Sequence, residues 1–221
     1  MVNVNIGIED LDILLAEGIP EGSLILLVGN VGSGADLFAQ QALYRQVENG
    51  VRCAYFAVEK PIDDVRLDMD AFQFKVQPYE EKGDWKFIYV DESIPIDVFQ
   101  KILIENITEK RWTFLDSLSP IILRTNLTET IKMIKTVKLT ARKNGGLHFI
   151  HLTHGMHDSQ TETTLKHFVD GVFEFEFRPS IRGVGRSLTI TKMKGVALEV
   201  ETIPYRITSR GIAIETATRI I

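Results

Sequence analysis

The amino-acid sequence predicts an α/β protein, with a mainly parallel sheet flanked by helices and C-terminal antiparallel strands. Two observations support this prediction. Up to about residue 170, short apolar segments alternate with amphipathic ones, which is typical of successive strand–helix units. Beyond that point strand-like segments follow one another with no helical pattern between them. We expect one domain over residues 1–221, because 44% hydrophobic content suits a single core and no long polar linker divides the chain.

The individual elements follow from apolar spacing and from turn residues. Continuous or alternating apolar segments predict strands at 24–28, 51–58, 86–90, 112–116 and 147–152. Helical spacing predicts helices at 8–15, from 35 to a stop at 49–50, and at 63–74, 96–107, 127–143 and 162–169. Residues 79–84 are predicted to be a charged loop, and the late strands are predicted at 171–177, 186–192, 198–207 and 211–214.

The aromatic residues of the segment 173–177 alternate with glutamates, which is the period of a strand. We expect one face of this strand in the core and the other in water. An edge strand that accepts a strand from a partner is the alternative.

A glycine-rich turn joins the first apolar strand to the first long helix. Gly29, Gly32 and Gly34 lie in this turn, and strand, glycine-rich turn and helix is the setting of a phosphate-binding loop. In such loops the backbone N–H groups and the N-terminus of the helix hold an anion. A tight turn that binds nothing would need the same glycines, so this alternative stays open.

The residues after the turn depart from the motif G-x-x-x-x-G-K-[ST]. Ala35 occupies the lysine position, Asp36 occupies the serine or threonine position, and Leu37 follows. The loop therefore lacks the cation that contacts the phosphates and carries an additional anion. A unit charge about 4 Å away contributes roughly 4 kcal/mol at an effective dielectric of about 20. Either change alone predicts a loss of nucleotide affinity of about a hundredfold or more.

A dinucleotide site is an alternative for the same turn. Gly29, Gly32 and Gly34 form G-x-x-G-x-G rather than G-x-G-x-x-G, although Glu59 at the end of the next strand could replace the ribose-binding acid. The order of the glycines argues against this alternative.

Composition and charge limit the classes of partner. The net charge of −5 provides no broad basic field for nucleic acid, although the predicted helix at 127–143 has a basic face. The N-terminus lacks the pattern of a signal peptide, no apolar run reaches the length of a membrane span, and Cys53 is the single cysteine. We expect a cytoplasmic protein with no membrane association, with Cys53 buried as a small apolar side chain.

Histidines recur around the predicted strand 147–152. They are His148, His151, His154 and His157, and Asp158 follows them. Three-residue spacing along a strand sends successive side chains to opposite faces, so only His154, His157 and Asp158 could gather around a metal. A polar strand end without a metal is the expectation we favour.

Several of these segments, in their order, resemble the KaiC-like branch of the RecA-type P-loop ATPases, and archaeal members in particular. The resemblance covers nearly the whole chain and implies a RecA-like sheet. The matching segments are residues 7–15, 18–22, the 29–37 loop, Glu59, residues 114–118, 170–172 and 186–195.

The resemblance implies ATP with Mg²⁺ at interfaces between subunits of a homo-oligomer. It would make Asp116 the Mg²⁺ residue and Glu59 the base that activates water. It would place Lys192 and Lys194 at the nucleotide of a neighbouring subunit. Lys60, however, stands where the family carries a second glutamate.

These departures predict a catalytically inactive RecA/KaiC-like domain that works by binding other proteins or peptides, with no cofactor. The alternative is a weak ATP-binding regulator or slow ATPase. In that case Asp36 would coordinate Mg²⁺ and Lys60 or Lys192 would replace the lost cation.

Overall fold

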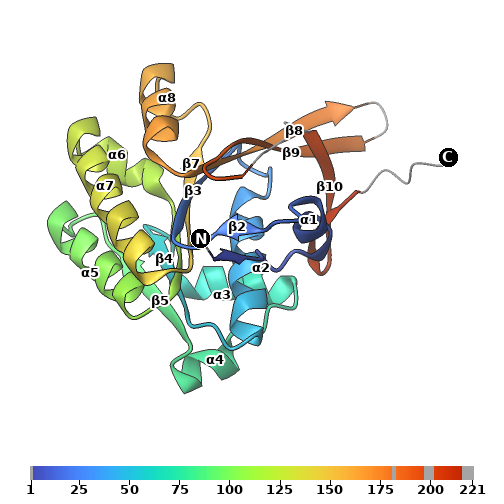
Figure 1. Cartoon of the computed structure of the whole chain (residues 1–221), viewed down its shortest axis with the longest axis horizontal. Helices are drawn as coiled ribbons and strands as arrows, with labels where there is room; N and C mark the ends of the chain where they lie inside the picture. The colour runs from blue at the N-terminus through green and yellow to red at the C-terminus, as the bar shows by residue number, and fades with distance from the viewer. Residues whose placement is uncertain (1, 181–182, 197–201, 216–221) are drawn as a thin grey trace.

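The computed structural model describes residues 2–180, 183–196 and 202–215. Its main sheet contains β3 (Ser23–Gly29), β4 (Cys53–Val58), β5 (Trp85–Val90), β6 (Trp112–Asp116), β7 (Leu147–Thr153), β8 (Gly171–Ser180), β9 (Gly183–Met193), β10 (Thr202–Thr208) and β11 (Gly211–Ile214). The strand order is β11-β10-β9-β8-β3-β7-β6-β4-β5. Figure 1 shows β8, β9 and β10 on the opposite side of the molecule from β4 and β5. Pairing is parallel from β8 to β5 and antiparallel from β8 through β11. The predicted α/β fold class is therefore confirmed.

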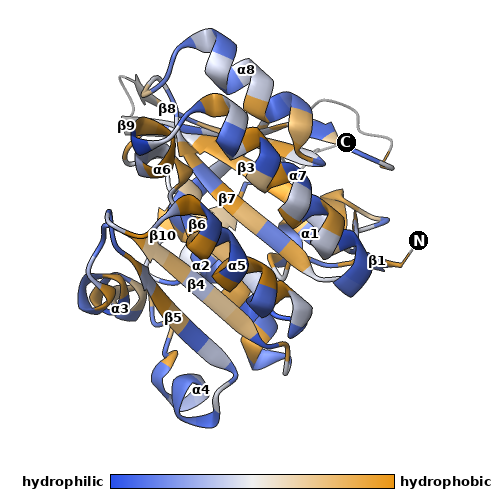
Figure 2. Cartoon of the chain, turned by 90° about the vertical axis from the view of Figure 1, so that its left-hand side faces the viewer, coloured by the Kyte–Doolittle hydropathy of each residue, from blue (hydrophilic) through white to orange (hydrophobic). Residues whose placement is uncertain are grey.

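Helices cover both faces of the sheet and bury two apolar layers. One layer packs beneath α1 (Glu9–Leu14), α2 (Ala35–Glu48), α3 (Ile62–Ala71) and α4 (Gln77–Lys82). The other packs beneath α5 (Ile96–Thr108), α6 (Leu118–Arg124), α7 (Leu127–Asn144) and α8 (Ser159–Phe168). Strands β4 and β7 are largely hydrophobic between these layers, as Figure 2 shows, because burial on both faces requires apolar side chains throughout.

Two helices depart from the sequence expectation. The predicted charged loop at 79–84 is wrong, because α4 occupies most of it, with Pro78 in its first turn and Gly83 as its left-handed C-cap. The short helix α6 was not predicted at all, although it buries Leu118, Ile121 and Ile122. A helix of six or seven residues completes fewer than two turns, so its apolar spacing is a weak signal in the sequence.

A small sheet was also missed. Strands β1 (Asn3–Val4) and β2 (Ile19–Pro20) pair antiparallel at the N-terminal end of the chain. A strand of two residues is too short to show alternation of apolar and polar side chains, so the sequence pattern does not predict β1 or β2.

The aromatic segment 173–177 lies inside the sheet. It belongs to β8, whose residues 173–175 pair with β3 on one side and β9 on the other, so this part of the segment is not an edge strand. Residues 176 and 177 continue the pairing with β9. Phe173 and Phe175 are buried against Phe38 of α2, with ring centroids 5.8 and 5.2 Å from that of Phe38. These contacts hold α2 on the sheet and so position the turn that precedes it.

Cys53 is fully buried, as predicted, and burial raises the pKa of its thiol. No helix in the described part of the chain has both the length and the apolar character needed to cross a membrane.

Candidate functional site

The candidate site lies at the carboxyl ends of the parallel strands, where the 29–37 loop leaves β3. Gly32 and Gly34 have φ angles of 81° and 89°, a region that side chains disfavour, and this lets the chain turn tightly into α2. The N–H of Ser33 donates to the carbonyl of Asn30 at 2.9 Å. A Cβ on Gly29 would lie 2.9 Å from that of Ala35, so the close approach of strand and helix requires glycine there.

The C-terminal strands hold this loop from outside. The hydroxyl of Tyr205 donates to the carbonyl of Ser33, and the Nε of Arg186 donates to the carbonyl of Gly32 at 3.4 Å. Burial raises the pKa of Tyr205, so this hydroxyl keeps its proton. The side-chain oxygen of Ser33 is buried and has no hydrogen-bond partner among the described residues.

The first turn of α2 carries a carboxylate. Asp36 accepts a hydrogen bond from the N–H of Leu37 at 2.9 Å, while Ala35 is buried. The first N–H groups of a helix have no acceptor within the helix and favour an anion. Asp36 supplies that negative charge from the chain itself and so opposes a phosphate at the same place.

Asp116 ends β6 and is buried in a set of polar side chains. One carboxylate oxygen accepts a 2.5 Å hydrogen bond from the hydroxyl of Tyr55, and the other lies 3.3 Å from the Nδ1 of His151. Gln40 of α2 donates to the hydroxyl of Tyr55 at 3.3 Å. Burial alone would raise the pKa of Asp116, but its interactions with His151, Tyr55 and Lys60 together lower it. Asp116 is therefore a carboxylate whose two oxygens both have partners within the chain.

Lys60 approaches this carboxylate directly after β4. Its ammonium lies 3.2 Å from Asp68 of α3 and 4.0 Å from Asp116. Burial opposes its charge, but Asp116, Asp68 and Asp36 raise the pKa of Lys60 on balance. The ammonium is therefore a permanent cation beside Asp116.

Glu59 turns to a different neighbour. Its backbone has φ 56°, an uncommon conformation for a residue with a side chain, and its carboxylate lies 3.8 Å from the guanidinium of Arg124. Arg124 in turn donates to the carbonyl of Asp91 at 2.8 Å. Glu59 and Arg124 line a pocket of about 360 Å³ together with Glu92, Pro120, Leu123 and Met156. The structure thus gives Glu59 and Asp116 separate sets of partners.

The histidines divide as the strand period predicts. His148 and His151 belong to β7, where His148 bonds Thr113 and His151 bonds Asp116. His154 donates to the buried Glu162 at 3.1 Å. In residues 2–180, 183–196 and 202–215, no three His, Cys, Asp or Glu side chains are placed so that they could hold a metal ion. His154, His157 and Asp158 therefore do not form a metal cluster.

Asp158 is the N-cap of α8, since its carboxylate accepts from the N–H of Thr161 at 2.8 Å. We expect Asp158→Ala to lower the melting temperature by about 2–4 °C because the cap is lost, and Asp158→Asn to lower it by less, since Asn also caps. Thermal unfolding measured with and without EDTA checks this. A wild-type melting temperature that falls in EDTA and a variant that is insensitive to EDTA would contradict a cap-only role.

The two lysines proposed to reach a neighbouring subunit lie at the end of β9. Lys192 donates to the carbonyls of Lys166 and His167 at 2.9 and 2.8 Å, at the C-terminal end of α8. Its side chain is therefore engaged within its own chain. Lys194 is exposed, and its N–H donates to the carbonyl of Asp170 at 2.9 Å.

Part of the basic face of α7 is also engaged within the chain. Lys138 and Arg142 lie 3.1 and 2.7 Å from the buried Asp170, and Lys135 lies 4.6 Å above the ring of Phe168. This face therefore provides less free positive charge than the sequence suggests.

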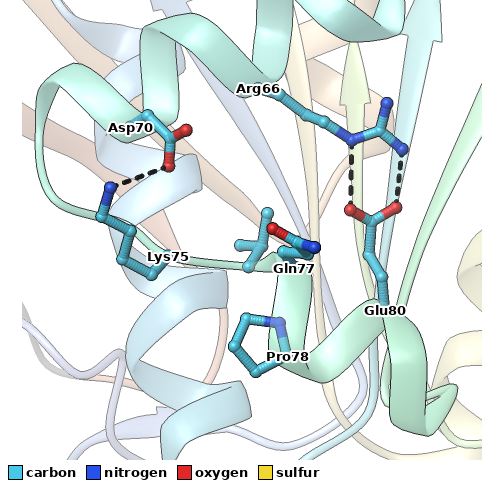
Figure 3. A pocket seen from close by; sticks show the side chains of 7 residues that line it. Arg66, Asp70, Lys75, Gln77, Pro78 and Glu80 are labelled. Carbon is cyan, nitrogen blue, oxygen red and sulfur yellow. Dashed lines mark hydrogen bonds and ion pairs between the residues drawn. The ribbon is translucent and has the colours of Figure 1, made fainter.

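A larger pocket, of about 590 Å³, lies between α3 and α4 (Figure 3). Arg66 pairs with both oxygens of Glu80 at 3.1 and 2.8 Å, and Lys75 lies 3.6 Å from Asp70. The charged side chains that line this pocket are thus paired with one another, which makes it a poor site for an ionic ligand.

Sequence reasoning located the loop, Glu59 and Asp116, but it missed their partners. These are Tyr55, Gln40, His151, Arg124, Arg186 and Tyr205. Side chains two residues apart in a strand point to the same face, so strand alternation could have placed Tyr55 on the same face of β4 as Ala57, which lies beside Asp116 in the sheet. The pairing of residue 57 with Asp116 depends on sheet register, which the sequence pattern does not provide.

The residues at this site do not fit a magnesium–ATP complex of the kind that the resemblance implies. The loop has a carboxylate where the metal-binding hydroxyl belongs, and both oxygens of Asp116 already have partners. Lys60 also places a positive charge where a divalent cation would approach Asp116.

Comparison with known proteins agrees with the fold. A UPF0273 protein of Pyrococcus horikoshii is 26% identical over 230 residues, covering 96% of this chain and 93% of that protein. The crystal structure of a KaiC-like protein from the same organism superposes with a TM-score of 0.84 at 21% identity, covering 97% of this chain and 99% of the other. The flagellar accessory protein FlaH of Methanocaldococcus jannaschii superposes with a TM-score of 0.81 at 19% identity, covering 98% and 100%. The family model described as the KaiC ATPase matches residues 4–219, so the chain belongs to the KaiC ATPase family.

Proposed function

We propose that this protein is a member of the KaiC family that does not hydrolyse ATP and that acts by binding other proteins or peptides. In this proposal the 29–37 loop is a degenerate phosphate-binding loop that keeps its backbone shape as part of the scaffold. A homo-oligomer is part of the same proposal, and sedimentation of the purified protein tests it.

The surroundings of Asp116 carry the proposal. A residue that holds a metal through water needs free lone pairs facing the nucleotide. Here Tyr55 and His151 each bond one oxygen, and Lys60 lies beside the pair. These partners fix the orientation of the carboxylate and occupy part of its acceptor capacity, and the nearby ammonium opposes a divalent cation.

The position of Glu59 supports the same conclusion. A general base must come within hydrogen-bond reach of the attacking water. Glu59 is drawn towards Arg124 and a pocket in which the side chain of Leu123 is 63% exposed and that of Met156 is 45% exposed. An ion pair with Arg124 beside exposed side chains differs from the water-excluding surroundings that favour a catalytic base.

We expect no ATP turnover above background. The loop lacks the lysine that contacts the phosphates, Lys60 opposes a metal ion at Asp116, and Glu59 pairs with Arg124. Phosphate release from ATP in the presence of Mg²⁺, measured at micromolar enzyme, checks this. The matched variant is Glu59→Gln, which keeps the size of the side chain. Turnover by the wild-type protein that disappears in Glu59→Gln would refute the proposal, whereas turnover equal in both would indicate a contaminant.

Weak nucleotide binding is a second candidate, favoured by the buried Ser33 oxygen that has no partner and by the clamp of Tyr205 and Arg186 on the loop. A preserved loop with an unsatisfied polar atom is compatible with an anion that completes it. Calorimetric titration of ATP with and without Mg²⁺ separates the candidates. Micromolar binding that requires Mg²⁺ would favour this one, and no heat in either buffer would favour the first.

A further inference from the structure

Lys60 lies among carboxylates that come from three different elements. Asp36 belongs to α2, Asp68 to α3 and Asp116 to β6, and the ammonium of Lys60 lies 3.2 Å from Asp68 and 4.0 Å from Asp116. The Lys60 side chain is only 32% exposed, so solvent screens these charges incompletely. The charge of Asp36 also acts on Lys60 and raises its pKa.

Asp116 needs a compensating cation because it is 8% exposed. A buried carboxylate without one is strongly disfavoured, even when neutral donors bond it. Tyr55 donates a neutral hydroxyl, which keeps its proton because burial and Asp116 raise its pKa, and a phenol carries no positive charge. His151 lies 3.3 Å from the other carboxylate oxygen and also lowers the pKa of Asp116. The ammonium of Lys60 lies 4.0 Å away and is charged at neutral pH, because Asp116, Asp68 and Asp36 raise its pKa.

We propose that Lys60 is a tethered cation that replaces a divalent metal ion at Asp116, so that this site neither needs nor admits Mg²⁺. The inference rests on the proposed function, since it explains why the site would be closed to metal-dependent chemistry. A metal ion at Asp116 would lie near the ammonium. One pair of like unit charges about 4 Å apart lowers affinity by more than about a hundredfold.

The test uses Mg²⁺ alone, with no nucleotide. We expect the melting temperature of the wild-type protein to be unchanged by millimolar MgCl₂. In Lys60→Gln the carboxylates of Asp68 and Asp116 lose their cation, and we expect Mg²⁺ to raise the melting temperature by about 2–4 °C in a saturable way. Calcium, which accepts more flexible oxygen ligands, should act at least as strongly.

Two variants act as controls. Lys75→Gln removes the same charge from the exposed pair with Asp70 and should gain no response to Mg²⁺. Lys60→Arg keeps a cation and should also show none. A merely structural ion pair would destabilise Lys60→Gln without creating a response to metal.

The outcomes are decisive in both directions. Stabilisation of the wild-type protein by Mg²⁺ would overturn the inference, and this measurement does not depend on whether any variant folds. A folded Lys60→Gln protein whose melting temperature is changed by neither Mg²⁺ nor Ca²⁺ would overturn the inference as well. Because no nucleotide is present, either result leaves the proposal of absent ATP hydrolysis to its own assay.

Discussion

Ala35→Lys combined with Asp36→Thr is expected to raise ATP affinity by more than a hundredfold. The change restores the cation and the hydroxyl that contact phosphates and Mg²⁺ in such loops, and it removes an anion from the first turn of α2. Each charge change contributes roughly 4 kcal/mol at a separation of about 4 Å and an effective dielectric of about 20. Calorimetric titration with ATP measures the effect.

The control for this double variant makes the same charge changes at the other end of α2. Glu48→Thr with Asn49→Lys also adds one lysine and removes one carboxylate, far along the helix from the loop. It should leave ATP affinity unchanged. If the loop variant folds and still fails to bind ATP both with and without Mg²⁺, then the backbone of the loop has lost its capacity for phosphate, and the missing charges are not the main defect.

A loss of about 3 kcal/mol of folding stability is expected as the pH falls from 7 to about 4, owing to His148. This side chain is 1% exposed, its Nε2 donates to the carbonyl of Gly145 at 3.0 Å, and Thr113 bonds its Nδ1. Burial lowers the pKa of His148 from 6.5 to about 4. Between pH 6.5 and pH 4 the unfolded chain therefore binds a proton at His148 that the folded chain does not bind. The stability that the neutral, buried His148 contributes is complete above pH 6.5 and is lost as the pH falls towards 4.

Urea unfolding at several pH values between 7.5 and 4.5 measures this loss. His148→Gln should reduce the pH dependence over this range, whatever its stability at neutral pH. His167→Gln removes an exposed histidine instead and should keep the wild-type pH dependence. Equal pH profiles for wild type and His148→Gln would show that other groups cause the loss.

The sequence allowed part of the site to be predicted. The apolar strand, the glycines and the helix after them locate the loop, because these patterns are local along the chain. Asp116 and Glu59 follow apolar strands, which places them at the carboxyl edge of a parallel sheet. Their partners could not be predicted. Tyr55 is 61 residues from Asp116 and His151 is 35 residues from it, and only the sheet order brings them together.

What the sequence determined by itself is the fold class and the chemistry absent from the loop: an α/β sheet with Ala35 and Asp36 at the head of its first long helix. Only the tertiary structure decided which side chains lie next to the carboxylates of Asp116 and Glu59. The carboxylate of Asp116 lies 3.3 Å from His151 and 4.0 Å from Lys60, and that of Glu59 lies 3.8 Å from Arg124. The physical reason is that apolar periodicity is a property of consecutive residues, whereas the compensation of a buried charge depends on neighbours that folding brings within about 4 Å.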